Sequence, residues 1–173
     1  DKKYYPYTEK QGLCKDTRNI QKSKENSFRL ENFKKIESNN SVALRTALQD
    51  GPVAATIRAG SRVFRDYANG ILESKSCTSA FPDHEYDHGV LVIGYGQTIL
   101  GLPYFLVKNS FGKSWGNQGY AMISAADNGE VGGTCGILNN LYQPIITTKN
   151  VNSKYNVQQS MFWFWILKSN WIF

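Results

Sequence analysis

Long apolar runs, basic clusters and a recognisable start signal are all missing from this sequence of 173 residues. No apolar run approaches the ~20 residues that a membrane-spanning helix requires, so we expect no membrane span. Basic residues outnumber acidic ones by 20 to 14, but they are scattered without a basic helix or an aromatic-interleaved stripe, which argues against a nucleic-acid partner. The chain opens at Asp1 without an initiator methionine or a secretory signal, and we expect an internal start in a fragment or processed product.

Histidine is scarce, and both copies fall within one short motif. The segment from His84 to His88 has the pattern H-E-x-x-H, which binds zinc when a helix places both rings on one face. Gly89 and a run of strand-forming residues follow at once, so a helix would end at its second ligand. No other histidine can supply a third ligand, and nothing recommends Glu130 for that role. A zinc peptidase is therefore a remote alternative, and we expect neither a metal site nor an organic cofactor.

Cysteine is also scarce, with three copies at Cys14, Cys77 and Cys135. This odd number is compatible with one disulfide and an unpaired thiol, or with three free thiols, and spacing alone does not decide between them. The remaining composition, 41% hydrophobic and 20% charged, is that of a globular chain long enough to bury a core.

Local patterns predict short elements separated by turns. Asn40 or Ser41 can cap a helix that runs to Asp50, where Gly51-Pro52 ends it. Aliphatic, β-branched and aromatic runs predict strands, and glycines separate the later ones, which favours an antiparallel sheet or small barrel. In chain order we expect a short strand within 27–36, a strand at 53–57, one or two helical turns within 61–68, and strands at 90–93, 104–107 and 120–123.

His88 and Asn109 become neighbours if the strands at 90–93 and 104–107 form an antiparallel hairpin. His88 begins the first strand and Asn109 ends the second. An imidazole can take the proton of a thiol, and an amide oxygen can hold the other ring N–H, which fixes the tautomer and orientation of the base. Spacing alone does not establish such a site, so the surrounding sequence decides.

That surrounding sequence resembles the papain family of cysteine proteases. Asp87–Val90 and Val92–Gly96 are similar to the block around the catalytic histidine of that family, and Tyr104–Tyr120 (YFLVKNSFGKSWGNQGY) to the block around its catalytic asparagine. Cys135–Ile137 is similar to a late cysteine segment, and the similarity runs from about residue 4 to residue 146. The resemblance implies an α+β, papain-like fold. Its antiparallel, barrel-like right domain would occupy 37–146, residues 1–36 would be a remnant of the helical left domain, and 147–173 would be an appended tail outside the fold.

The resemblance also implies roles for individual residues. His88 would be the general base and acid, Asn109 would orient it, and Trp115 would pack beneath the asparagine loop. Phe111 stands where the family usually has a tryptophan that shields the His–Asn hydrogen bond, so a ring is kept but indole area is lost. Five residues would approach the substrate, two of them near the pocket for the second side chain upstream of the cut bond (Thr56 and Asn140), the others being Asp87, Tyr86 and Phe111.

The nucleophile of the family lies in a Q-x-x-x-x-x-C-G-S-C-W stretch, and no such stretch occurs here. Cys14 is too close to His88 in the sequence, because the family histidine follows its cysteine by ~130–150 residues. By resemblance, Cys14 is instead a disulfide cysteine whose partner lies elsewhere, and Cys77 pairs with Cys135. Such bridges imply an oxidising location, lysosomal, endolysosomal or secreted, and the glycosylation sequon at Asn39–Ser41 is consistent with that.

The resemblance therefore implies a peptidase that hydrolyses peptide bonds through a thioester acyl-enzyme. Its partners would be polypeptide substrates and cystatin-like or propeptide inhibitors. Because the nucleophile is absent, we expect this chain alone to be inactive. An inactive papain-fold homologue that acts as a binding module is the alternative.

Overall fold

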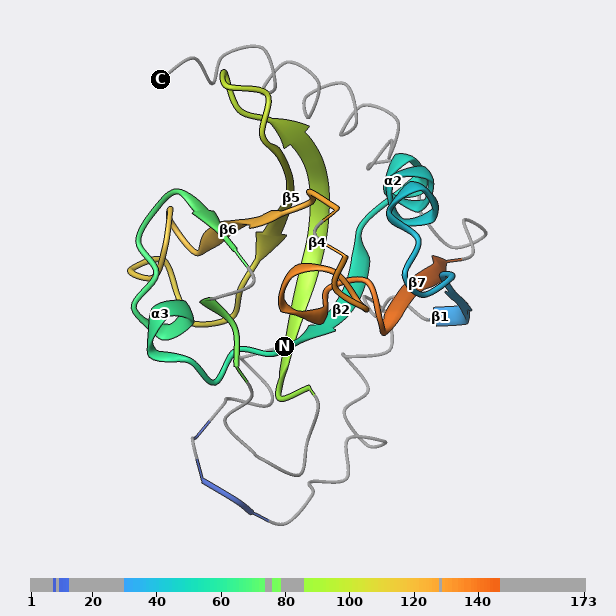
Figure 1. Ribbon diagram of the computed structural model, residues 1–173. Coiled ribbons are helices and arrows are strands. Elements are labelled where there is room, and N and C mark those ends of the chain that lie inside the picture. The colour runs from blue at the N-terminus through green and yellow to red at the C-terminus, as the bar shows by residue number, and fades with distance from the viewer. Residues whose placement is uncertain are drawn as a thin grey trace, which may run out of the picture.

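The computed structural model describes residues 8, 10–12, 30–73, 76–78, 86–127 and 129–146. One sheet of seven strands dominates this part of the chain (Figure 1), in the order β1-β7-β2-β4-β5-β6-β3. Each strand pairing is antiparallel except that of β3 with β6. The elements are β1 (Leu30–Lys35), α2 (Ser41–Asp50), β2 (Val53–Ile57), α3 (Arg62–Arg65), β3 (Ile71–Leu72), β4 (His88–Gln97), β5 (Pro103–Lys108), β6 (Tyr120–Ser124), the 3-10 turn η2 (Thr134–Gly136) and β7 (Leu141–Ile146).

The observed α+β architecture, a mostly antiparallel sheet with few helices, confirms the expected class. Every predicted helix and strand is present, and β2 has the predicted bounds, whereas β4, β5 and β6 are longer than the apolar runs that predicted them. The strands β3 and β7 were not predicted. The strand expected at 90–93 extends over His88–Gln97, because backbone pairing continues through polar and glycine positions that hydropathy does not mark. β1 lies within the segment 1–36 and is hydrogen-bonded to β7 in the same sheet. The division of the chain into domains stays a prediction.

Helix α2 begins and ends as its sequence predicts. The Asn40 side chain accepts a hydrogen bond from the Ala43 amide at 2.8 Å, which satisfies one of the free donors of the first turn. At the other end, the buried Gln143 side chain of β7 donates from Nε2 to the carbonyls of Ala47 at 2.7 Å and Gly51 at 3.0 Å. The end of the helix is thereby joined to the sheet.

The core lies where alternate residues of the strands meet α2, α3 and the η2 turn. In β2, the residues at 53, 55 and 57 are buried while those at 54 and 56 face outward, as the two-residue period of a strand requires. The largest fully buried side chains are Phe64, Phe105, Leu44, Ile57, Ile123, Ile137 and Leu141. This core holds β4 and β5 in a fixed register. His88 is the first residue of β4, and Asn109 directly follows β5.

Cys77 and Cys135 form a disulfide, with Cα atoms 5.1 Å apart. Cys135 lies in η2 and is completely buried, whereas Cys77 lies between β3 and β4. The pair named from the resemblance is therefore present. Cys14, His84, Glu85 and the tail 147–173 lie outside the described residues.

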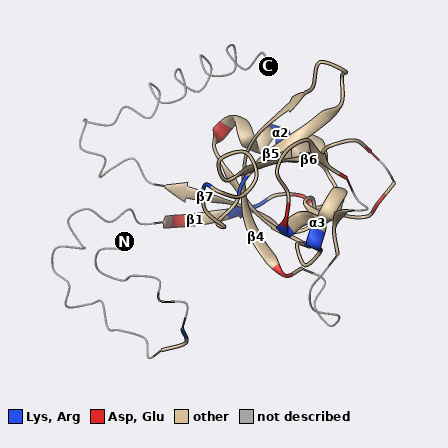
Figure 2. Cartoon of the chain, turned by 90° about the vertical axis from the view of Figure 1, so that its left-hand side faces the viewer, with Lys and Arg blue, Asp and Glu red and all other residues tan. Residues whose placement is uncertain are grey.

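Two further expectations concern membranes and nucleic acids. Among the described residues, no helix has the length and apolar character needed to cross a bilayer. Figure 2 shows lysines and arginines dispersed over several elements and mixed with acidic residues, in keeping with their scatter along the sequence.

Candidate active site

His88 and Asn109 meet at one end of the β4–β5 hairpin. Leu91 pairs with Lys108, and continuing that register places Asn109 opposite the second residue after His88. Residues offset by two across an antiparallel pair lie on the same face, within reach of a long side chain. His88 Nε2 is 2.7 Å from Asn109 Oδ1, so the neighbours expected from the hairpin are directly hydrogen-bonded.

A backbone amide determines the tautomer of this pair. The Ser110 N–H also lies 2.7 Å from Asn109 Oδ1, and a backbone N–H can only donate. The Asn109 atom that faces it must be the oxygen, and the histidine nitrogen beside that oxygen must carry a hydrogen. In neutral His88 the proton is therefore on Nε2, and the lone pair on Nδ1 is available to accept a proton.

The asparagine is held in a rigid glycine-containing loop. Its backbone N–H donates to Gly119 O at 2.9 Å, and its side chain is buried, with Nδ2 unpaired among the described residues. Gly116 has φ of +56°, and a Cβ there would lie 2.5 Å from the Tyr120 carbonyl oxygen. The close approach of these two backbone segments therefore requires glycine at position 116, in the loop whose Gly119 carbonyl holds the Asn109 amide.

Four aromatic rings support the histidine. Phe111 lies 4.9 Å from the His88 ring and is 45% exposed, so it covers the pair from the solvent side. Phe64 of α3 contacts His88 edge-on at 6.0 Å, and Trp115 packs on Phe64 at 5.2 Å and on Phe111 at 5.8 Å. The Trp115 Nε1 donates to Phe64 O at 3.1 Å. Phe111 and Trp115, which the sequence analysis named, thus lie in one aromatic group with Phe64, which it did not name, and their expected roles stay predictions.

Tyr67 is the fourth ring, and it contacts Trp115. It packs on Trp115 at 5.3 Å, donates its hydroxyl to Gly70 O at 2.6 Å and accepts from the Met122 amide. Burial raises the pKa of the Tyr67 phenol above its usual range, and the bond from the Met122 amide opposes that shift only in part. The ring therefore stays neutral around physiological pH.

Asp87 and Tyr86 lie immediately before His88 and join neighbouring segments. Asp87 Oδ1 accepts from the Ala59 amide at 2.7 Å, which ties the start of β4 to the end of β2. Tyr86 is half-buried, and its hydroxyl is hydrogen-bonded to the Asn139 side chain. Their expected contact with substrate stays a prediction.

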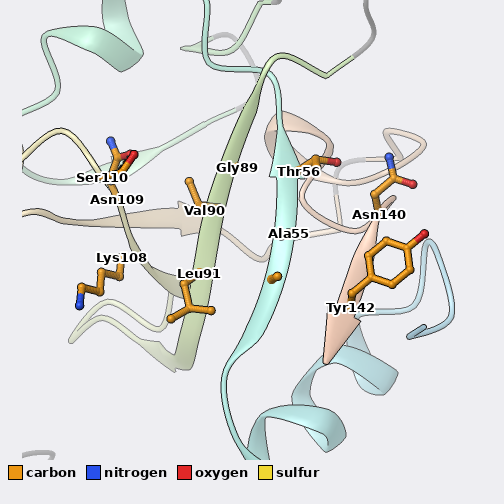
Figure 3. A pocket seen from close by; sticks show the side chains of 11 residues that line it. Ala55, Thr56, Gly89, Val90, Leu91, Lys108, Asn109, Ser110, Asn140 and Tyr142 are labelled. Atoms are coloured by element: carbon orange, nitrogen blue, oxygen red, sulfur yellow. Dashed lines mark hydrogen bonds between the residues drawn. The ribbon is translucent and has the colours of Figure 1, made fainter. Parts of the chain in front are cut away.

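An open hollow of about 510 Å³ lies beside Asn109, lined by residues in or next to β2, β4, β5 and β7. Thr56, Asn109 and Asn140 all line it, so the two residues predicted to lie near a substrate pocket share one cavity with the hydrogen-bond partner of His88. Figure 3 shows Thr56 and Asn140 on one side of β4 and Asn109 on the other. The Thr56 hydroxyl is buried without a hydrogen-bond partner among the described residues. Further lining residues that the sequence analysis did not name are Lys108, Ser110, Tyr142, Ala54 and Leu91.

The described residues of this site show no group of metal ligands, and His84 and Glu85 lie outside them. Within the described ranges, no three histidine, cysteine or acidic side chains lie close enough to hold an ion together. The Nε2 atom of His88 is engaged by Asn109.

Comparisons with known proteins agree on one family. The family model for "Papain family cysteine protease" matches residues 1–145. Cysteine proteinase EP-B 1 of Hordeum vulgare is 34% identical over 146 residues, which cover 83% of this chain and 36% of that protein. Mexicain of Jacaratia mexicana is 33% identical over 141 residues, covering 82% of this chain and 58% of mexicain.

Solved structures give the same result. The bromelain protease of Ananas comosus, in complex with an inhibitor, matches with a TM-score of 0.68 and 28% identity, over 84% of this chain and 62% of that one. The ragweed pollen cysteine protease Amb a 11, in its proform, matches with a TM-score of 0.67 and 25% identity, over 86% and 42%. The chain thus spans little more than a third of the cereal relative and less than two thirds of the bromelain chain.

Proposed function

Because the chain belongs to the papain family of cysteine proteases, we propose that it carries the proton-transferring half of a cysteine peptidase site. The observation that supports this most strongly is the His88–Asn109 hydrogen bond of 2.7 Å, whose tautomer follows from the Ser110 N–H. The reaction is the hydrolysis of a peptide bond, with His88 as base and then acid and Asn109 as its positioning residue.

In this proposal Nδ1 of His88 accepts the proton of a cysteine thiol. The thiolate then attacks the peptide carbonyl carbon, the C–N bond breaks, and His88 returns the proton to the leaving amine. A thioester remains until water, deprotonated by the same nitrogen, hydrolyses it. The Asn109 oxygen keeps the imidazole in one orientation throughout, and Phe111 excludes water from the hydrogen bond between them.

The thiol comes from outside these 173 residues. Cys77 and Cys135 are used in a disulfide, and Cys14 does not match the spacing or context of the family nucleophile. The 173-residue chain by itself is accordingly inactive. Turnover of a dipeptidyl fluorogenic substrate by this chain alone, blocked by a thiol alkylator, would contradict the proposal.

Two single alanine variants of the full-length protein, one at each histidine, provide the test. His88→Ala removes the base, and we expect activity to fall at least 10³-fold, as loss of a triad base does. His84→Ala is the matched control, because a zinc peptidase of the H-E-x-x-H type needs both rings and would lose activity with either. Equal losses in the two variants, together with inhibition by a chelator, would favour the zinc alternative.

Substrate contacts are also proposals. Thr56 and Asn140 line the hollow beside Asn109, which supports their assignment to the pocket for the second upstream side chain. Asp87, Tyr86 and Phe111 surround His88 in sequence or space and would border the same cleft. The bromelain relative was solved with an inhibitor and the ragweed relative with its propeptide, which supports polypeptide substrates and inhibitory segments as partners.

The location and domain organisation follow from the same family membership. The Cys77–Cys135 disulfide supports an oxidising location, lysosomal, endolysosomal or secreted. We assign 37–146 to the right domain, 1–36 to a remnant of the left domain, and 147–173 to an appended tail.

An inactive homologue that binds peptides is the second candidate, because both cysteines among the described residues are joined in a disulfide. The coding sequence upstream distinguishes the two: a C-G-S-C-W block supports a peptidase, and serine or glycine at the nucleophile position supports a binding module.

A further inference from the structure

We propose that Asn39 is a site of N-linked glycosylation, a modification independent of the peptidase activity. The pattern N-x-S/T occurs once in the 173 residues, as Asn39-Asn40-Ser41. A sequon in the sequence is by itself a weak indication, because it requires an accessible asparagine and an oxidising, secretory environment. Both requirements are met by features of this structure.

Accessibility is the first of them. Asn39 is an exposed residue in the turn between α2 and β1, and β1 is an edge strand of the sheet. Its φ of +58° is one that asparagine tolerates better than most residues, so this turn favours the residue that the sequon needs. The neighbouring Asn40 is different, since Oδ1 and Nδ2 of its side chain bond to Ala43 and Glu37.

Only the oxygen end of the Asn39 side-chain amide is hydrogen-bonded among the described residues. Oδ1 accepts a hydrogen bond from the Gly132 amide, and the backbone N–H of Asn39 donates to Leu138 O at 2.9 Å. No hydrogen bond engages Nδ2 among the described residues, and Nδ2 is the atom to which a sugar is attached. The folded chain can therefore keep both bonds to the 132–138 loop whether or not Nδ2 is substituted.

The transfer needs a second reactant, an oligosaccharide linked to a lipid diphosphate. Asn39 Nδ2 forms a bond to the first carbon of the first sugar, and the bond from that carbon to an oxygen of the lipid diphosphate breaks. Nδ2 loses one proton in this step, and the leaving diphosphate takes it up. The Cys77–Cys135 disulfide indicates that the chain folds in an oxidising compartment, where such a reactant is available.

Variants at Ser41 and Asn40 distinguish the loss of the sequon from an effect on folding. The chain would be expressed in a eukaryotic secretory host, with an added signal peptide and an appended C-terminal sequon that reports entry. Among molecules whose appended sequon is glycosylated, we expect a second shift to lower mobility in gel electrophoresis, caused by a second glycan. Peptide-N-glycosidase should remove this second step, and mass analysis of the peptides should assign the glycan to Asn39. Ser41→Ala should lose this step completely, because it breaks the sequon without touching the bonds of Asn39.

Asn40→Ser is the matched control, since it keeps the sequon and replaces one good helix cap by another. We expect it to retain full occupancy at Asn39. Absence of the second step in unmodified molecules that carry the reporter glycan would overturn the proposal, as would its persistence in Ser41→Ala.

Discussion

Trp115→Phe tests whether the aromatic support beneath His88 has the structure described. Phenylalanine keeps one ring against Phe64 but loses the indole N–H that donates to Phe64 O at 3.1 Å. That carbonyl also accepts from the Tyr67 amide at 3.2 Å, so it is not left without a partner. Losing this one hydrogen bond should then lower the free energy of unfolding by about 0.5–1.5 kcal/mol, less than the penalty for leaving a buried polar group unsatisfied.

The lost area of the second indole ring adds to this. Trp115 is 7% exposed, and replacing it with phenylalanine removes roughly 50 Å² of buried apolar surface, or about 1.3 kcal/mol at ~25 cal/mol per Å². The two terms together predict a loss of about 2–3 kcal/mol in the free energy of unfolding. Trp115→Ala should cost more, about 3–5 kcal/mol, because it also leaves a cavity.

Urea unfolding followed by far-UV circular dichroism measures both variants. With a slope of about 2 kcal/mol per M, Trp115→Phe should lower the midpoint by about 1 M. Val131→Ala is the control, because Val131 is 79% exposed and its truncation should stay within about 0.5 kcal/mol. A Trp115→Phe midpoint indistinguishable from that of the control would refute the packing and hydrogen bond described here.

Three further predictions concern the surrounding structure. The raised pKa of Tyr67 means that its neutral form favours the folded state. This contribution is complete below the unfolded pKa of about 10 and is lost as pH rises through the folded pKa. The free energy of unfolding should therefore begin to fall near pH 10, and Tyr67→Phe should flatten the dependence of the urea midpoint on pH above that value. Replacing both Cys77 and Cys135 with serine should lower the free energy of unfolding by about 4 kcal/mol, and adding a reductant should change the stability of the unmodified chain but not of the double variant. In the full-length enzyme, Phe111→Trp should raise peptidase activity by covering more of the His–Asn hydrogen bond, and unchanged or lower kcat/KM would count against that role.

Local sequence was sufficient for most of the secondary structure and for the hairpin. Asn40 and Gly51-Pro52 mark the ends of α2 because capping and chain termination depend on neighbouring residues alone. Apolar runs located β4, β5 and β6, although β4 extends beyond its run at both ends. The short connection between β4 and β5 favours antiparallel pairing, so the proximity of His88 and Asn109 was predictable, and the family blocks around them supplied the chemistry.

Tertiary structure decided what depends on segments far apart in the chain. The sequence showed Phe64 only as an apolar residue in a helical turn, and only the fold brings its ring to His88 at the start of β4. The disulfide partners were named from a resemblance, since three cysteines permit several pairings, and the fold brings the chosen two together. Likewise, the proton on Nε2 of His88 follows from a Ser110 N–H whose direction depends on the loop after β5. By itself, then, the sequence determined most of the elements, the family and the identity of the His–Asn pair, because these reside in local patterns, whereas β3, β7 and η2 were seen only in the structure. The packing around that pair, its tautomer and its shared hollow with Thr56 and Asn140 required long-range contacts, whose geometry no local pattern encodes.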